Sequence, residues 1–147
     1  MTVVARYLIV LILMAAVIAA AIVFSNYQQG RILISIGGAK VEVEIADSTA
    51  ERIRGLSGRD PLPEGKGMLF IFESDGYHGI WMRDMRFAVD IVWADAKGKI
   101  VTVARNVAPE TYPKVFEPSA LARYVLEVPA GFAKRNSIAE GDKIVLK

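Results

Sequence analysis

Cysteine is absent from this sequence of 147 residues, and histidine occurs once, as His78. The lack of cysteine excludes a disulfide framework and cysteine-based chemistry. A single histidine also excludes zinc sites that need two, including the HExxH type. A serine–histidine pair would have to use His78, and its neighbour Ser74 lacks the Gly-x-Ser-x-Gly pattern of a nucleophile elbow. We therefore expect no cofactor and assign no catalytic residue.

A soft-metal site is the remaining metal hypothesis, because thioether and imidazole ligands suit reduced copper. The candidate ligands are His78, Met68, Met82 and Met85. In a strand, however, His78 and Met82 would lie about 13 Å apart, too far to share one ion. Packing is the ordinary role of methionine, so we predict no metal site.

A strong excess of one charge is also missing. The chain has 18 basic and 16 acidic residues, a formal net charge of +2. It has no basic stripe of the kind that contacts nucleic-acid phosphates, and no phosphate-binding Gly-rich loop ending in Lys-Ser or Lys-Thr. Nucleic acid is therefore not an expected partner.

Long apolar runs are confined to the N-terminus. Of the first 25 residues, 22 are hydrophobic, and the exceptions are Thr2, Arg6 and Ser25. An 18-residue helix over 7–24 would be about 27 Å long, and the addition of residues 3–5 matches the hydrocarbon core of a bilayer. We expect a transmembrane anchor within residues 1–25 that contacts the membrane through residues 3–24, followed by a soluble domain over residues 26–147.

A cleaved secretory signal is the alternative for residues 1–25, with small residues at 19–21 as a cleavage site. The apolar run is longer than the roughly 7–15 residues usual in signals, which favours the anchor. Arg6 directly before the run favours an N-terminus on the cytoplasmic side. Both interpretations place the soluble domain outside the cytoplasm.

The soluble part has the pattern of short strands. Strands are predicted at 31–36, 40–45, 68–72, 79–82, 88–94, 100–104, 123–128 and 143–146. A capping box at Ser48–Glu51 predicts a short helix that ends near Gly55, and residues 130–136 have room for one or two helical turns. Residues 73–77 are predicted to turn, and 106–119, with three prolines, to form a long loop.

The segments between most strands are too short for helical crossovers. We therefore expect an α+β domain with a mainly antiparallel sheet that curls into a partly closed β-barrel or a sandwich, with one or two short helices. The fold would be preceded by the N-terminal transmembrane helix.

Two carboxylates lie within apolar strands. Asp90 is flanked by Val89 and Ile91, and Glu127 by two further apolar residues. A buried, unpaired carboxylate is costly, so each must reach water, a cation or backbone amides. One interpretation is structural, with the carboxylates pinning loops or pairing across the sheet. The other is a pair that lines one cleft for acid–base work or for ligand hydroxyls.

Trp81 lies beside Arg83 and Asp84. An exposed indole with these neighbours would suit a sugar ring or a peptide, whereas a core tryptophan is the structural alternative. The ligand-binding candidates are therefore Trp81, Arg83, Asp84, Asp90 and Glu127.

A set of short motifs occurs in a fixed order over residues 40–147. The set is Gly55-Leu56, Arg59, Gly67-Met68-Leu69-Phe70, Trp81-Met82, Asp90-Ile91, Val125-Leu126-Glu127, Gly131 and Gly141-Asp142. The ordered set resembles the family called domain of unknown function one-nine-two. The resemblance implies a compact β-rich domain, often with an N-terminal signal or anchor, and no established activity.

The resemblance also bears on the site candidates. Members often carry lysine and asparagine where this chain has Arg83 and Asp84, whereas Asp90 and Glu127 agree with the family pattern. Our leading hypothesis is a membrane-tethered module outside the cytoplasm that binds an envelope polymer or a partner protein. The alternatives are a structural envelope protein and a hydrolase of envelope material that uses Asp90 and Glu127.

Overall fold

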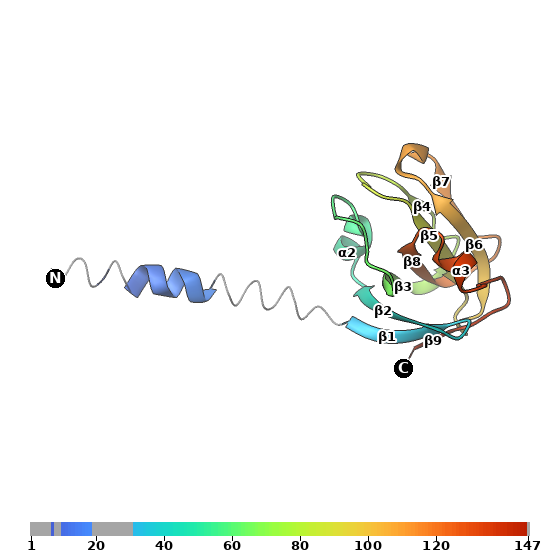
Figure 1. Cartoon of the computed structure of the whole chain (residues 1–147), viewed down its shortest axis with the longest axis horizontal. Helices are drawn as coiled ribbons and strands as arrows, with labels where there is room; N and C mark the ends of the chain where they lie inside the picture. The colour runs from blue at the N-terminus through green and yellow to red at the C-terminus, as the bar shows by residue number, and fades with distance from the viewer. Residues whose placement is uncertain (1–6, 8–9, 19–30, 147) are drawn as a thin grey trace. The chain divides into compact units, whose positions relative to one another are not determined.

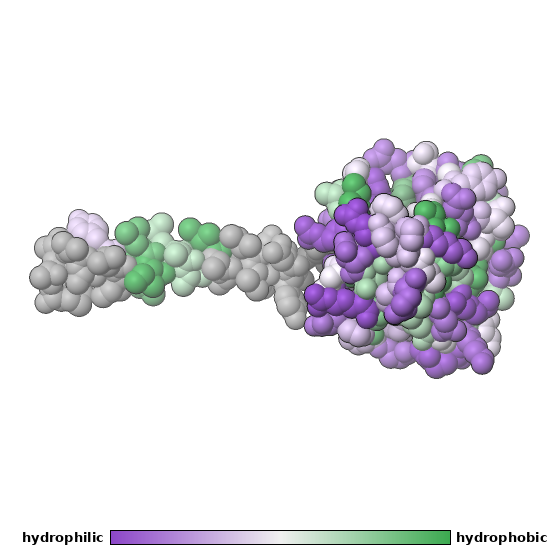
Figure 2. Space-filling model, turned by 90° about the horizontal axis from the view of Figure 1, so that it is seen from above, coloured by the Kyte–Doolittle hydropathy of each residue, from purple (hydrophilic) through white to green (hydrophobic). Residues whose placement is uncertain are grey.

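The computed structural model in Figure 1 describes residue 7 and residues 10–18 and 31–146. Residues 1–30 and 31–147 separate into two compact units, and each is described by itself. In the first unit residues 10–18 are helical, with exposed side chains drawn in shades of green in Figure 2. No helix among the described residues has the length and apolar character needed to cross a membrane. Most of the predicted membrane segment, residues 3–24, and all of the alternative cleavage site at 19–21 lie outside the described residues.

The second unit is rich in β-structure, and its helices are short, as predicted for an α+β domain. Its elements within residues 31–146 are β1 (Arg31–Ile36), β2 (Ala39–Ala46), α2 (Thr49–Arg54), β3 (Lys66–Gly76), β4 (Ile80–Trp81), β5 (Val89–Ala94), β6 (Ile100–Val107), the 3-10 turn η1 (Pro109–Thr111), β7 (Val115–Phe116), β8 (Ala122–Pro129), α3 (Phe132–Arg135) and β9 (Ile144–Leu146).

Seven of these strands form one sheet in the order β6-β5-β8-β3-β2-β1-β9, and β4 pairs with β7 in a second, two-stranded sheet. The pairs are antiparallel except β2–β3, which α2 connects as a short crossover. The mainly antiparallel sheet is therefore confirmed.

The two outer strands of the large sheet meet at one end. Lys99, before β6, bridges Lys143, before β9, and the amide of Ile144 donates to the carbonyl of Gly98 at 2.8 Å. Gly98 has a φ of +76°, and an added Cβ would lie 2.4 Å from the Ile144 carbonyl oxygen, so only glycine fits this close approach. The seam closes part of the sheet into a half-barrel.

Alternation along the strands gives the large sheet two apolar faces. In β5, Val92 and Ala94 belong to the core that α3 covers, where Phe132 and Ala133 pack. Val89, Ile91 and Trp93 belong to a second core on the opposite face. That second core also contains Ile80 of β4, Leu56, which follows α2, and Met82, so the small sheet is packed against the outer face of the half-barrel.

The local sequence signals of the N-terminal half form as predicted. Gly37 and Gly38 make the turn between β1 and β2. The Ser48 hydroxyl accepts from the Glu51 amide while the Glu51 carboxylate accepts from the Ser48 amide, which completes the capping box. The helix α2 ends at Arg54, with Gly55 as its C-cap.

Two expectations about loops are wrong. The predicted turn at 73–77 is instead the end of β3, which pairs with β8 again at Gly76–Ala122 after an irregularity beyond Ile71. The predicted loop at 106–119 contains η1 and β7. The end of β3 and the strand β7 depend on pairing with distant strands, which a local apolar pattern does not reveal.

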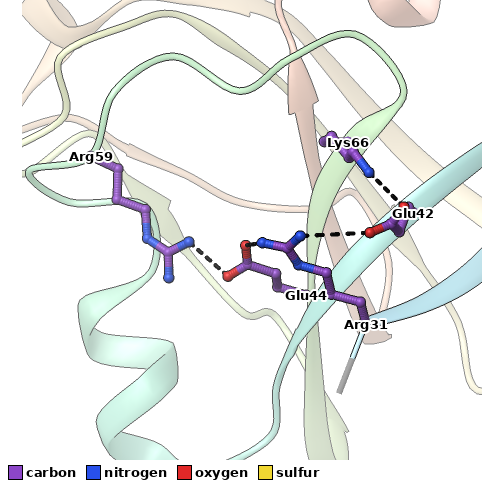
Figure 3. Close-up of polar contacts among 5 residues, drawn as sticks. All are labelled: Arg31, Glu42, Glu44, Arg59 and Lys66. Atoms are coloured by element: carbon purple, nitrogen blue, oxygen red, sulfur yellow. Dashed lines mark hydrogen bonds and ion pairs between the residues drawn. The ribbon is translucent and has the colours of Figure 1, made fainter. Parts of the chain in front are cut away.

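A network of five charged side chains fastens the segment between α2 and β3 to the first hairpin (Figure 3). Glu44 of β2 pairs with Arg59 at 2.7 Å and with Arg31 at 3.2 Å. Glu42 pairs with Lys66 at 2.5 Å and with Arg31 at 3.7 Å. The Lys66 hydrogen bond is the main cause of the lowered pKa of Glu42. The network fixes the entry to β3, which runs beneath the candidate site.

Candidate functional site

A groove separates α2 from β4. Its walls are Thr49, Arg52 and Ile53 on the helix and Gly79, Ile80 and Trp81 on the strand side, and its floor is Phe70 and Phe72. Its volume is about 340 Å³, at the small end of the roughly 300–1,000 Å³ usual for ligand sites. We call it the α2–β4 groove.

The rim of the groove exposes apolar side chains on both sides. Ile53 is 68% exposed and Trp81 is 46% exposed. Ile53 belongs to α2, which has six residues and buries none of them. An apolar floor between two exposed apolar rims is typical of a surface that binds a ligand.

Glu127 lies at the base of the same region. A cavity of about 70 Å³ shares six residues with the α2–β4 groove, and Glu127 is one of its walls. This space is several times the roughly 10–15 Å³ that one water molecule needs. We call it the Glu127 cavity.

The carboxyl group of Glu127 is buried without compensation. The residue is 4% exposed, and its Oε2 atom has no hydrogen-bond partner among the described residues. Burial raises the pKa of this carboxyl from 4.5 to about 7, because an ionised group loses its hydration there. Near neutral pH the group therefore exchanges between a neutral donor and a charged acceptor.

Glu127 owes its position to strand register. In β8 it alternates with Leu126 and Val128, which belong to the core under α3, so its side chain points to the opposite face. There it is paired in register with Ile91 of β5 and Met68 of β3. The carboxyl thus stands among apolar neighbours of the second core.

Trp81, Arg83 and Asp84 form a continuous exposed surface beside the groove. The Arg83 guanidinium carbon lies 5.6 Å from the Trp81 ring centroid, and Arg83 Nε lies 3.4 Å from Asp84 Oδ2. The backbone of the pair is anchored, because the Ser57 hydroxyl donates to the Arg83 carbonyl and the Gly58 amide donates to the Asp84 carbonyl. The predicted indole with Arg and Asp neighbours is therefore present.

Asp90 lies elsewhere. It is fully buried, and its two oxygens accept hydrogen bonds from the amides of Asn106 and Ala133, each at 2.8 Å. It thus caps the first turn of α3 and holds the end of β6. Asp90 lies opposite Val128 in the ladder, one position from Glu127, so the two carboxyls face opposite sides of the sheet and do not share a cleft. This geometry counts against the hydrolase alternative.

The structure thus brings Trp81 and Glu127 to one site, with Arg83 and Asp84 at its edge, and leaves Asp90 apart. The wall residues Arg52 and Ile53 and the floor residue Phe72 were not predicted from the sequence. A six-residue helix is too short to show a periodic apolar face, so no sequence signal marks Ile53 as a rim residue.

Arg52 and His78 are tied to the floor of the groove by aromatic contacts. The rings of Phe72 and His78 stack 3.6 Å apart, and the Arg52 guanidinium carbon lies 5.2 Å from the Phe72 centroid. Arg52 also donates to the carbonyls of Asp47 and Ile71. The described residues contain no group of three or more His, Cys, Asp or Glu side chains that could hold a metal ion.

The fold and groove define a small β-rich domain built on a half-barrel, with a surface site between its outer helix and its two-stranded sheet. Residues 32–146 match the family DUF192, described as "Uncharacterized ACR". The chain belongs to this family, and the resemblance seen in its ordered motifs is confirmed.

Several proteins and solved structures are similar to this chain. UPF0127 proteins of Pyrococcus abyssi and Pyrococcus horikoshii are 29% and 30% identical to this chain over 108 residues, which cover 70% of it and 84% and 85% of those proteins. A solved structure described as a proposed transcription regulator of Sinorhizobium meliloti has a TM-score of 0.76 and 25% identity, with 80% of this chain and 95% of the other covered. A protein of unknown function from Novosphingobium aromaticivorans has a TM-score of 0.74 and 25% identity over 78% of this chain and 84% of the other.

Proposed function

We propose that residues 31–146 are a binding module whose ligand occupies the α2–β4 groove. The observation that carries the proposal is the buried Glu127 carboxyl, whose Oε2 atom has no partner at the base of that groove. Leaving a buried polar group unsatisfied costs about 1–3 kcal/mol, and a ligand group that reaches it removes this cost. No catalytic role is assigned, because the other charged side chains that line the Glu127 cavity are Arg52 and Arg54, and no second carboxyl or imidazole from the described residues lines it.

The proposal includes a tether to a membrane through residues 3–24, with the binding module outside the cytoplasm. The apolar composition of this segment supports it, and a tether would concentrate the module near an envelope polymer or partner protein. Mass spectrometry of the membrane fraction should recover the chain with residues 1–24 intact. A mature chain that starts near Asn26 would contradict the tether and leave the binding site unaffected.

The similar structure from Sinorhizobium meliloti is described as a proposed transcription regulator, which raises nucleic acid as a candidate ligand. The formal net charge of +2 is small for a phosphate-binding surface. We therefore propose a ligand other than nucleic acid.

The test of the groove is a ligand titration of the full-length protein followed by NMR. The probes are chitohexaose and mixtures of short peptides, and we expect at least one probe to shift the Trp81 indole and the Ile53 methyl signals saturably. Trp81→Ala should weaken that binding at least tenfold, because it removes one wall of the groove. Tyr77→Ala is the matched control, since Tyr77 is an aromatic residue that is 60% exposed and does not line the groove.

The structural-protein alternative gives a different result. It predicts that no probe shifts the groove signals, or that the shifts are the same in Trp81→Ala and Tyr77→Ala. Either outcome would refute the binding module.

A further inference from the structure

The strand β4 has an edge that the fold leaves unpaired. β4 consists of two residues, Ile80 and Trp81, paired antiparallel with Phe116 and Val115 of β7. In an antiparallel ladder consecutive residues direct their N–H and C=O groups to opposite edges. One of the two residues therefore points its backbone groups away from β7, and these groups have no backbone partner among residues 31–146.

The unpaired edge borders the α2–β4 groove. β7 occupies one edge of β4, and in Figure 1 β4 is drawn between α2 and β7. Gly79, Ile80 and Trp81 line the groove together with α2. The groove thus combines unused backbone hydrogen-bonding groups with an apolar floor, which is the combination that strand-adding peptides use.

The charges on the helix side of the groove are positive. Arg52 and Arg54 line the groove or the Glu127 cavity, and neither makes an ion pair with a carboxylate in the part of the chain that the structure describes. Arg52 donates to backbone carbonyls and to the Thr49 hydroxyl, and it has no carboxylate partner among the described residues. The ligand that complements this side is acidic.

We propose that the ligand of the α2–β4 groove is an extended acidic peptide segment of a partner protein, which adds to β4 as a third strand opposite β7 and inserts an apolar side chain over Phe70 and Phe72. This inference rests on the proposed function and names its ligand class. Backbone bonds to β4 supply affinity, the apolar side chain supplies specificity, and acidic neighbours face Arg52 and Arg54. A polar group beside the inserted side chain reaches the Glu127 cavity.

The probes are blocked heptapeptide mixtures with glutamate at both terminal positions and Leu, Ile, Met, Phe or Tyr fixed at the centre. Matched mixtures carry lysine in place of glutamate. Full-length protein should bind at least one glutamate mixture, and at least tenfold more tightly than its lysine counterpart. Equal affinity for the two sets would overturn the acidic assignment.

N-methylation tests the strand pairing itself. In an added strand, successive amides face β4 and solvent in turn. The peptide mixture that binds most tightly is therefore made in two forms, one N-methylated at the odd-numbered amides and one at the even-numbered amides. One form should bind like the parent, and the other at least tenfold more weakly, because it loses its bonds to β4. Two forms with equal affinities would overturn strand addition and leave the groove as a side-chain site.

Hydrogen exchange gives a second measurement on the protein. Peptide binding should slow exchange at least tenfold at one amide of β4, either Ile80 or Trp81, and leave the other, already bonded to β7, little changed. Ile53→Ser should weaken peptide binding, because Ile53 is a rim residue. Leu121→Ser is the matched control, since Leu121 is 51% exposed and outside the groove.

The test separates this inference from the proposed function. If chitohexaose shifts the groove signals and no peptide mixture does, the peptide inference is wrong and the binding module stands with a carbohydrate ligand. If neither probe shifts those signals, both proposals fail together.

Discussion

The substitution Glu127→Gln tests whether the carboxyl at the base of the α2–β4 groove is uncompensated. Glutamine keeps the shape of the side chain and removes its titration. In the folded protein the pKa of Glu127 is about 7, against an ordinary 4.5. That gap corresponds to about 3 kcal/mol of unfolding free energy, at about 1.4 kcal/mol for each pH unit.

The direction follows from proton counting. Below about pH 4.5 the carboxyl is protonated in both the folded and the unfolded chain, so it contributes no pH dependence. Between about 4.5 and 7 the folded chain alone keeps the proton, and the unfolding free energy of the wild type falls as pH rises. Above about 7 the group is ionised in both states and the full penalty is present. Glutamine does not ionise, so the variant carries no such penalty at any pH.

The measurement is urea unfolding of both proteins at intervals from pH 4 to pH 8. The unfolding free energy of Glu127→Gln minus that of the wild type should rise by about 3 kcal/mol across this range. Glu42 and Glu51 have lowered pKa values, chiefly through hydrogen bonds to Lys66 and Ser48, and their opposite pH dependence cancels in the difference. Glu73→Gln is the control, because Glu73 is an exposed strand glutamate.

A difference that stays flat from pH 4 to pH 8 would refute the reasoning, because it would mean that the Glu127 carboxyl is solvated or paired in solution. Such a result would also remove the observation on which the binding module rests. A comparable rise for Glu73→Gln would show that the trend is a general effect of removing one negative charge.

Three further substitutions test the scaffold by denaturant unfolding. Asp90→Asn should cost about 2–4 kcal/mol, because an amide cannot accept from two backbone N–H groups with both of its polar atoms; a loss below about 1 kcal/mol would contradict its role at α3. Gly98→Ala should cost more than Gly58→Ala, since both have positive φ but only Gly98 approaches a carbonyl oxygen at the seam; equal losses would show that the seam is not close-packed. Arg59→Gln breaks the ion pair to Glu44 and should cost less than about 1 kcal/mol, and a loss that does not shrink in 1 M salt would contradict a mainly electrostatic contact.

Local signals predicted the elements that form from neighbouring residues. The alternation of Val41 and Val43 with Glu42 and Glu44 determines which face of β2 is buried, and the Ser48 capping box starts α2. The strand β7 was missed because its two residues are extended only by pairing with β4, which lies over thirty positions earlier in the chain. Its formation is a tertiary effect.

The candidate site was predictable only in part: the sequence marked Trp81 and Glu127, but not Arg52, Ile53 and Phe72 or the arrangement of the two carboxyls. The apolar neighbours of Asp90 and Glu127 indicate that each carboxyl is buried and needs a partner. Which face each one occupies depends on the register of β5 on β8, where Asp90 lies opposite Val128 and Ile91 opposite Glu127. A shift of one residue in that register would place both carboxyls on the same face, so no inspection of either strand alone could decide between a shared cleft and two separate sites.

The two carboxyls show how the same residue pattern leads to different roles. Asp90 faces the end of β6 and the start of α3. Its carboxylate accepts one backbone hydrogen bond from each, from the amides of Asn106 and Ala133. Glu127 faces β4 and α2, which offer its Oε2 atom no donor. The unpaired edge of β4 borders the same region. The unpartnered Oε2 atom and the unpaired strand edge lie on one side of the sheet, and folding alone does not readily explain both. A leucine at position 127, for example, would extend the apolar core without a buried charge. A ligand that supplies both a backbone edge and a polar group would account for them together.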